Sequence, residues 1–101
     1  MGKLVRDKIP EIIRASGTDP DCRVLEADEY LPSLFAKLFE ESEELRAAPR
    51  AHQLDELADV YEVLRALAAA TNHSMSDIEL AAQRKRAERG GFEDRIWLER
   101  W

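Results

Sequence analysis

The sequence has one cysteine, few aromatic residues and no long apolar run. Cys22 is the single cysteine, which excludes an intramolecular disulfide and argues against a cysteine-ligated zinc site. No apolar stretch approaches the roughly 20 residues of a transmembrane helix, and the N-terminal MGKLVRDKIPEII has no continuous apolar core of a signal peptide. These absences predict a cytoplasmic protein without a membrane span.

Positive charge is also scarce. The chain has 15 Lys and Arg residues against 21 Asp and Glu, a formal net charge of -6. This balance argues against a nucleic-acid-binding protein with a broad basic surface, and an acidic protein that handles anions needs local cations or a metal ion. The length of 101 residues predicts a single domain over 1–101 with a modest core that a partner subunit would complete.

Turn and capping signals divide the chain into four helices. Pro10 suits the first turn of a short helix that stops at Gly17. A second helix is expected over about 29–47, where Pro49 closes it, and a third over about 51–70. Ser74 begins a fourth helix that the glycine pair at 90–91 ends.

Two short stretches have the character of strands. Cys22–Leu25 is partly β-branched, and residues 95–99 alternate between apolar and polar side chains. We expect these stretches to pair into a ribbon that the helices support, because an isolated hairpin is marginal in water. The predicted fold is all-α, a small antiparallel helical bundle with a minor two-stranded β-ribbon.

Carboxylates interrupt the apolar faces of the second and third helices. Glu41 occupies the helical stripe of Leu34 and Leu38, and Glu44 lies at the edge of that stripe. In the third helix, Glu56 shares a stripe with valines and leucine, and Asp59 follows three residues later. Each helix therefore brings two acids to its core-facing edge.

Such acids need compensation, since burying an unpaired carboxylate costs several kcal/mol. Lys37 can pair with Glu40 or Glu41, but the third helix has few local cations. A divalent ion between antiparallel helices would offset the charge, and Mg²⁺ and Mn²⁺ prefer oxygen ligands. The alternative, that both acid runs are solvated helix faces, stays open at this point.

The acid runs belong to a wider pattern. KLFEESEEL followed by DELADVYEVL resembles the EExxE and ExxD motifs of the all-α nucleoside triphosphate pyrophosphatase superfamily, which includes MazG, dimeric dUTPases and phosphoribosyl-ATP pyrophosphohydrolase. KLVRDKIPEII near the start and KRAERGGFEDRIWLE near the end resemble one branch, the phosphoribosyl-ATP pyrophosphohydrolase-like or MazG-like house-cleaning proteins. The resemblance covers nearly the whole chain.

The resemblance implies hydrolysis of a nucleoside triphosphate, such as a non-standard one, to monophosphate and pyrophosphate with Mg²⁺ or Mn²⁺. It assigns Glu41, Glu44, Glu56 and Asp59 as metal ligands, and Glu40 as the acid that precedes them. Glu40 or Glu41 would accept the proton of the attacking water. The spacer between Glu44 and Glu56 is short for the superfamily, which predicts a tight turn and an open substrate pocket.

Two basic clusters are candidates for phosphate contact. One is at the N-terminus and the other is on the fourth helix, and the residues selected from them are Arg6, Lys85 and Arg89. The opposing interpretation, that each is solvated or paired with a nearby acid, stays open.

The third helix is apolar over more than half its circumference. Because relatives in the superfamily dimerise through such helices, we expect a homodimer or a higher homo-oligomer. The alternative function is a noncatalytic helical module that binds a nucleotide or a protein and acts as a sensor or scaffold. It would bind without turnover.

Overall fold

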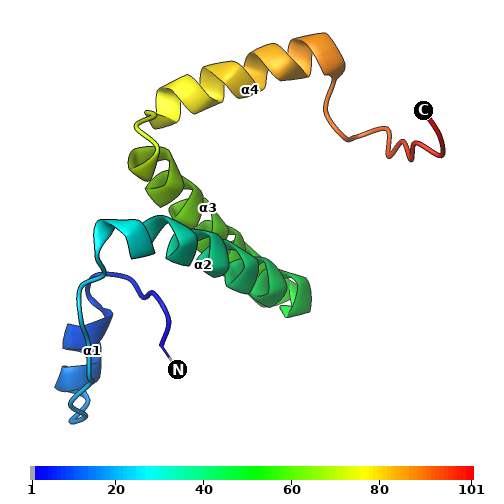
Figure 1. Ribbon diagram of the computed structural model, residues 1–101. Helices are drawn as coiled ribbons and strands as arrows, with labels where there is room; N and C mark the ends of the chain where they lie inside the picture. The colour runs from blue at the N-terminus through cyan, green and yellow to red at the C-terminus, as the bar shows by residue number, and fades with distance from the viewer. Residues whose placement is uncertain (1) are drawn as a thin grey trace.

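The computed structural model describes residues 2–101, and all regular structure in this range is helical (Figure 1). The elements, in chain order, are α1 (Ile9–Ala15), α2 (Ala27–Ala47), the 3₁₀ turn η1 (Arg50–His52), α3 (Gln53–Ala70) and α4 (Met75–Arg89). The expectation of an all-α protein with four helices is therefore confirmed.

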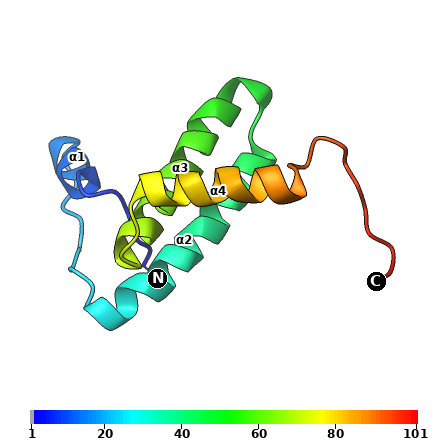
Figure 2. The same cartoon turned by 90° about the horizontal axis from the view of Figure 1, so that it is seen from above.

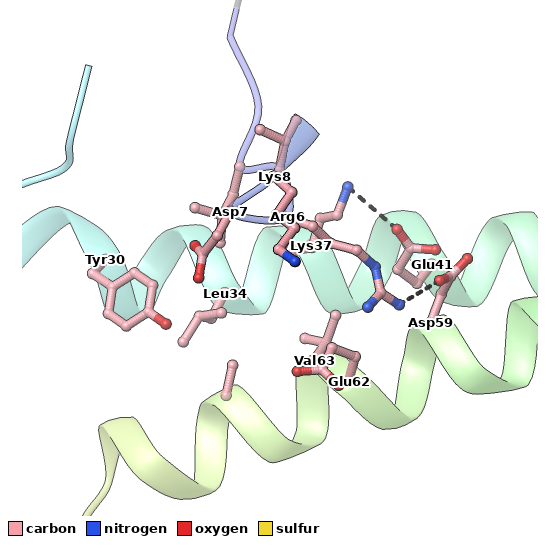
Figure 3. A pocket seen from close by; sticks show the side chains of 13 residues that line it. Arg6, Asp7, Lys8, Tyr30, Leu34, Lys37, Glu41, Asp59, Glu62 and Val63 are labelled. Atoms are coloured by element: carbon pink, nitrogen blue, oxygen red, sulfur yellow. Dashed lines mark hydrogen bonds and ion pairs between the residues drawn. The ribbon is translucent and has the colours of Figure 1, made fainter. Parts of the chain in front are cut away.

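The α2–α3 pair forms the centre of the molecule. The two helices lie side by side and antiparallel (Figures 1 and 3), because only Ala48, Pro49 and η1 separate them. The buried apolar side chains of the described residues all come from this pair, namely Leu34, Val63 and Ala68. The core is small, and it lies directly beside the acids described below.

Local hydrogen bonds fix where α2 and α4 begin. The backbone N–H of Glu26 donates to the Glu29 carboxylate at 3.0 Å, so α2 begins at Ala27, earlier than the sequence predicted. The Ser74 hydroxyl accepts from the backbone N–H of Asp77 at 3.0 Å, as expected of an N-cap residue. Gly90 ends α4 with φ 81°, a conformation that favours glycine.

The remaining parts pack less tightly. Within residues 2–101, α1 packs against no other helix, and α4 contacts only α3. Figure 1 shows α4 leaving the end of α3 and extending away from the α2–α3 pair, while residues 91–101 project from its far end. The Cα radius of gyration is 17.3 Å, whereas a compact chain of 100 residues has about 13 Å.

The predicted β-ribbon is wrong. Neither Cys22–Leu25 nor residues 95–99 form a strand, and 2–101 contain no sheet. Figures 1 and 2 place the two stretches at opposite ends of the molecule. Arg95 has φ 56° and its N–H donates to the Phe92 carbonyl at 3.1 Å, so a turn bends the chain where an extended strand was expected. The short apolar alternation was too weak a signal to specify a partner strand.

None of the helices within residues 2–101 is both long enough and apolar enough to cross a membrane.

Candidate metal centre

Three carboxylates from α2 and α3 converge in the structure. Glu41, Glu56 and Asp59 each offer an oxygen atom within 4.8 Å of the oxygens offered by the other two. Glu41 comes from α2, and the other two are three residues apart on α3, so that they share one face of that helix. Oxygen ligands at this spacing suit a hard divalent cation.

The burial of these acids is an independent sign of a ligand site. Glu41 is 6% exposed, and its Oε2 atom has no hydrogen-bond partner among the described residues. Oε2 of Glu56 is likewise buried without a partner. Because an unpaired buried carboxylate oxygen is costly, a cation between the two helices would satisfy both atoms. The residues present therefore fit a divalent ion.

Burial is the largest influence on the pKa of Glu41. Burial raises the pKa of its carboxyl group, and the neighbouring Glu44 side chain raises it further, while Lys37 acts in the opposite direction. The net effect is that the charged form of Glu41 is disfavoured in the protein without a cation. A bound cation would reverse this preference.

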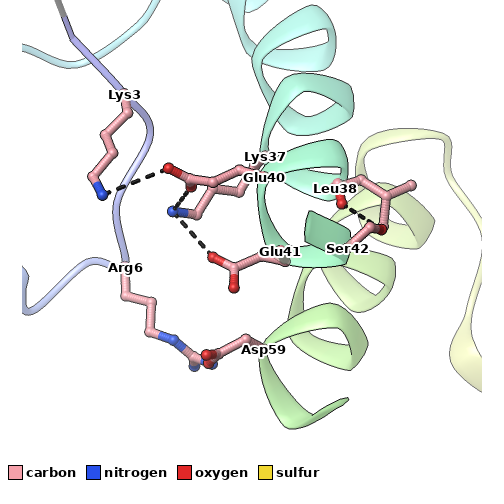
Figure 4. A network of polar contacts seen from close by, with 8 residues as sticks. All are labelled: Lys3, Arg6, Lys37, Leu38, Glu40, Glu41, Ser42 and Asp59. Atoms are coloured by element: carbon pink, nitrogen blue, oxygen red, sulfur yellow. Dashed lines mark hydrogen bonds and ion pairs between the residues drawn. The ribbon is translucent and has the colours of Figure 1, made fainter. Parts of the chain in front are cut away.

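Three basic side chains already surround the acids (Figure 4). Lys37 pairs with Glu41 at 3.2 Å and also with Glu40. Burial lowers the pKa of Lys37, but its hydrogen bonds to both glutamates outweigh that effect and the pKa is raised. From the N-terminal segment, Lys3 lies 3.6 Å from Glu40. The Arg6 guanidinium donates to the Asp59 carboxylate at 2.7 Å.

A cavity of about 460 Å³ opens beside this cluster (Figure 3). Its wall combines the N-terminal segment with the facing sides of α2 and α3. The lining residues are Leu4, Val5, Arg6, Asp7, Lys8, Tyr30, Leu34, Lys37, Glu41, Asp59, Glu62, Val63 and Ala66. Both basic and acidic groups therefore reach the same space, next to a carboxylate trio.

The other two predicted acids lie at the edge of the trio. Glu44 is exposed and acts on the Glu41 carboxyl group, but it does not belong to the converging set. Glu40 is partly exposed, and the hydrogen bond from Lys37 lowers the pKa of its carboxyl group. The structure thus separates the four acids predicted as ligands into a trio and a neighbour.

The predicted phosphate contacts fall into two places. Arg6 lies at the trio, whereas Lys85 and Arg89 are on α4, which does not line the cavity. In Figure 1 the α2–α3 pair lies between the N-terminal segment and α4. Within one chain, Lys85 and Arg89 are not brought to the acids.

Sequence reasoning did not select Lys3 or Lys37 as site residues. Lys37 had a usable signal, because it is three and four residues before Glu40 and Glu41 and so lies on the same helix face. The link from Arg6 to Asp59 spans 53 residues, and no local spacing predicts such a contact.

Comparisons with known proteins identify one relative over part of the chain. An uncharacterized protein of Mycolicibacterium smegmatis is 62% identical over 48 residues, which are 48% of this chain and 49% of that protein. The chain therefore matches about half the length of this relative. No protein-family model matches the chain, and no solved structure matches it.

Proposed function

We propose that the protein is a Mg²⁺-dependent nucleoside triphosphate pyrophosphohydrolase that releases a nucleoside monophosphate and pyrophosphate. The observation that carries the proposal is the buried, unpartnered Oε2 of Glu41 within a trio of carboxylates from two helices. This arrangement supports a cation site, and the motif resemblance supports the choice of reaction. The proposal includes a cytoplasmic location and action on non-standard nucleotides.

Glu41, Glu56 and Asp59 would hold the ion in this proposal. Mg²⁺ or Mn²⁺ bound there would neutralise negative charge on the phosphate oxygens and orient the triphosphate. Glu44, beside Glu41, is positioned at the edge of the same group and would complete the set of four acids. The acids would thus hold the cation at the place where the phosphate groups bind.

Proton transfer from the attacking water needs a carboxylate base. Glu40 and Glu41 are the two candidates, and their surroundings differ. Lys37 lowers the pKa of Glu40, whereas burial raises the pKa of Glu41. A carboxylate with a higher pKa is the stronger base, but a cation held by Glu41 would lower the pKa of that residue again, so both residues stay candidates for the acceptor.

Phosphate groups also need positive charge. Arg6 and Lys8 line the cavity from the N-terminal segment, and Lys37 lines it from α2. Arg6 offers a planar fork that matches two phosphate oxygens, while the lysines act as point charges. These groups would let an anionic triphosphate bind beside the acids.

One observation favours a noncatalytic module instead. Arg6 and Lys37 already neutralise part of the charge on Asp59 and Glu41, so the acids have partial compensation without a metal ion. A protein of that kind would bind a nucleotide or a protein partner as a sensor or scaffold and would not turn over any nucleotide.

A second copy of the chain is the proposed partner. The accessible surface is 9293 Å², whereas a compact monomer of this mass has about 5,800 Å². Large apolar side chains of α3 are exposed on the side that no other helix covers, among them Leu54, Leu57, Tyr61 and Leu64. Burial of these faces between two copies would remove part of the excess, and a homodimer is the simplest closed assembly.

A pyrophosphate-release assay tests the proposed reaction. Standard, deoxy and modified nucleoside triphosphates and phosphoribosyl-ATP would be offered with Mg²⁺ or Mn²⁺ to the wild type, to Glu56→Gln and to the matched surface variant Glu43→Gln. We expect pyrophosphate and a monophosphate from the wild type and from Glu43→Gln, and none from Glu56→Gln. Nucleotide binding without any turnover in the wild type would favour the noncatalytic module.

A further inference from the structure

We infer that Arg6 is a mobile counter-charge that pairs with Asp59 in the absence of metal and transfers to a phosphate group when the cation binds. The inference rests on the proposed function and adds to it an order of events at the site. The cation releases Arg6 from Asp59, and Arg6 is then free to bind the phosphate ligand.

The contact itself is specific. Arg6 Nη2 lies 2.7 Å from Asp59 Oδ1, and Asp59 is one of the three acids that converge. The hydrogen bond to Asp59 raises the pKa of Arg6, and the negative charges of Glu62 and Glu41 raise it further. Arg6 therefore lies in the combined field of three acids and holds a position near the one that a cation would take.

Arg6 and a divalent ion would compete for this position. A guanidinium that donates to Asp59 neutralises part of the charge that attracts the ion, and two cations a few ångströms apart repel one another. Binding of the ion would therefore weaken the contact between Arg6 and Asp59. The same argument predicts that removal of Arg6 strengthens the binding of the ion alone.

Of the two cations that pair with the trio, Arg6 is the one free to move. The Arg6 side chain is 54% exposed and is held by one carboxylate, whereas Lys37 is 17% exposed and pairs with both Glu40 and Glu41. Arg6 also belongs to a segment without regular structure that precedes α1. A rotation of its side chain needs no movement of a helix.

The cavity is the place where the released Arg6 side chain would bind a phosphate group. Arg6 and Asp59 line the same space, together with Lys8 and Lys37. A phosphate in that space would offer Arg6 two oxygens for its fork, whereas Arg6 contacts only the Oδ1 atom of Asp59. Since the cation releases Arg6 and the phosphate then engages it, the two ligands bind with positive coupling.

The test uses two binding titrations that do not depend on turnover. The first measures the affinity of Mn²⁺ for the protein alone by the electron paramagnetic resonance signal of free Mn²⁺. The second measures binding of methylenediphosphonate, which has two phosphorus groups and no bond that water can break, at saturating Mn²⁺. Both are done on the wild type, Arg6→Ala, Arg6→Lys and Arg23→Ala. Arg23→Ala is the matched control. Arg23 pairs with Glu29 at a distance of 2.8 Å, and neither residue belongs to the trio.

The inference predicts opposite changes from one substitution. Arg6→Ala should bind Mn²⁺ alone about three- to tenfold more tightly and methylenediphosphonate about tenfold more weakly than the wild type. In both titrations, the affinity of Arg6→Lys should fall between those of the wild type and Arg6→Ala, and Arg23→Ala should match the wild type. Circular dichroism checks that all variants keep their helix content.

Three results would overturn the inference. Weaker binding of both probes by Arg6→Ala would make Arg6 a structural residue, and unchanged Mn²⁺ binding would remove the competition. Tighter Mn²⁺ binding with unchanged diphosphonate binding would remove the transfer to phosphate. If the wild type binds no Mn²⁺ in either titration, the proposed metal site fails and the inference fails with it.

Discussion

The α2–α3 pair and the outer parts of the molecule use apolar side chains in different ways. The pair buries Leu34, Val63 and Ala68 and places a buried glutamate among them. The outer parts, which are α1, α4 and residues 91–101, contain no buried residue, and Trp101 is fully exposed. The difference teaches that a single chain packs only the α2–α3 pair, which holds the acids, and leaves the apolar side chains of its outer parts exposed.

The largest expected effect comes from the acid inside the pair. Glu41→Gln should reduce pyrophosphate release at least about 100-fold, because a neutral amide replaces a charged ligand. The same substitution should raise the melting temperature of the metal-free protein by about 2–4 °C at pH 7, since it removes a buried charge that lacks a full set of partners.

The size of the second effect, the change in melting temperature, depends on pH. Burial raises the pKa of Glu41, so the destabilisation is absent below the ordinary value of 4.5 and grows as pH rises through the raised pKa. The stabilisation by Glu41→Gln should therefore be present at pH 7 and largely vanish near pH 4, as measured by differential scanning calorimetry. Glu43→Gln on the exposed face of α2 is the control and should change neither property. A lower melting temperature for Glu41→Gln at pH 7 would show that Glu41 stabilises the fold.

The next effect contrasts a side chain of the pair with one of the outer parts. Leu34 is 2% exposed, so Leu34→Ala should lower the free energy of unfolding by about 2–4 kcal/mol. Ile12 on α1 is exposed, and Ile12→Ala should cost less than about 1 kcal/mol. Urea denaturation measures both. Equal losses would contradict the division into a packed pair and a loosely packed periphery.

The exposed apolar side chains provide a smaller and more selective effect. The double variant Leu57→Ser with Tyr61→Ser, on the exposed side of α3, should weaken self-association about tenfold or more, because aromatic anchors dominate interfaces. Sedimentation velocity over a range of protein concentrations measures the change. Val24→Ser, which alters another exposed apolar residue, is the control and should have less effect. A wild type that stays monomeric throughout would contradict the homodimer.

Much of this division could be predicted from residue periodicity. The apolar stripes of the second and third helices and the short spacer at Pro49 indicated adjacent antiparallel helices, and the same stripes placed Glu41 and Glu56 at their interface. These inferences succeeded because helical spacing is local and the side chains repeat every three or four residues. Glu41, Glu56 and Asp59 converge because this spacing places them on the facing sides of α2 and α3.

The rest could not be predicted because it depends on distant contacts or on weak patterns. Alternation over residues 95–99 suggested a strand, but the backbone turns at Arg95. The Arg6 contact to Asp59 bridges 53 positions, and no periodicity connects them. Lys85 and Arg89 were grouped with Arg6 by charge alone, although they lie on a helix that does not line the cavity.

The smallest expected effect concerns a surface ion pair outside the site. The hydrogen bond from Arg23 lowers the pKa of Glu29 to about 2, so any stability that this pair adds is present above the ordinary value of 4.5 and is lost as pH falls toward 2. Arg23→Ala should return the pKa of Glu29 toward its ordinary value, as measured by NMR titration, and should leave pyrophosphate release unchanged. A Glu29 pKa that stays near 2 in the variant would assign the shift to the Glu26 backbone instead.

Mn²⁺ binding by the metal-free protein tests the central claim most directly. Isothermal titration calorimetry would compare the wild type with Glu41→Gln, Glu56→Gln and Asp59→Asn, and with Glu43→Gln as the matched control. The account predicts saturable binding by the wild type and Glu43→Gln, and at least about tenfold weaker binding in each of the three trio variants. Binding of equal strength in all five proteins, or no binding by the wild type, would contradict a metal centre formed by Glu41, Glu56 and Asp59.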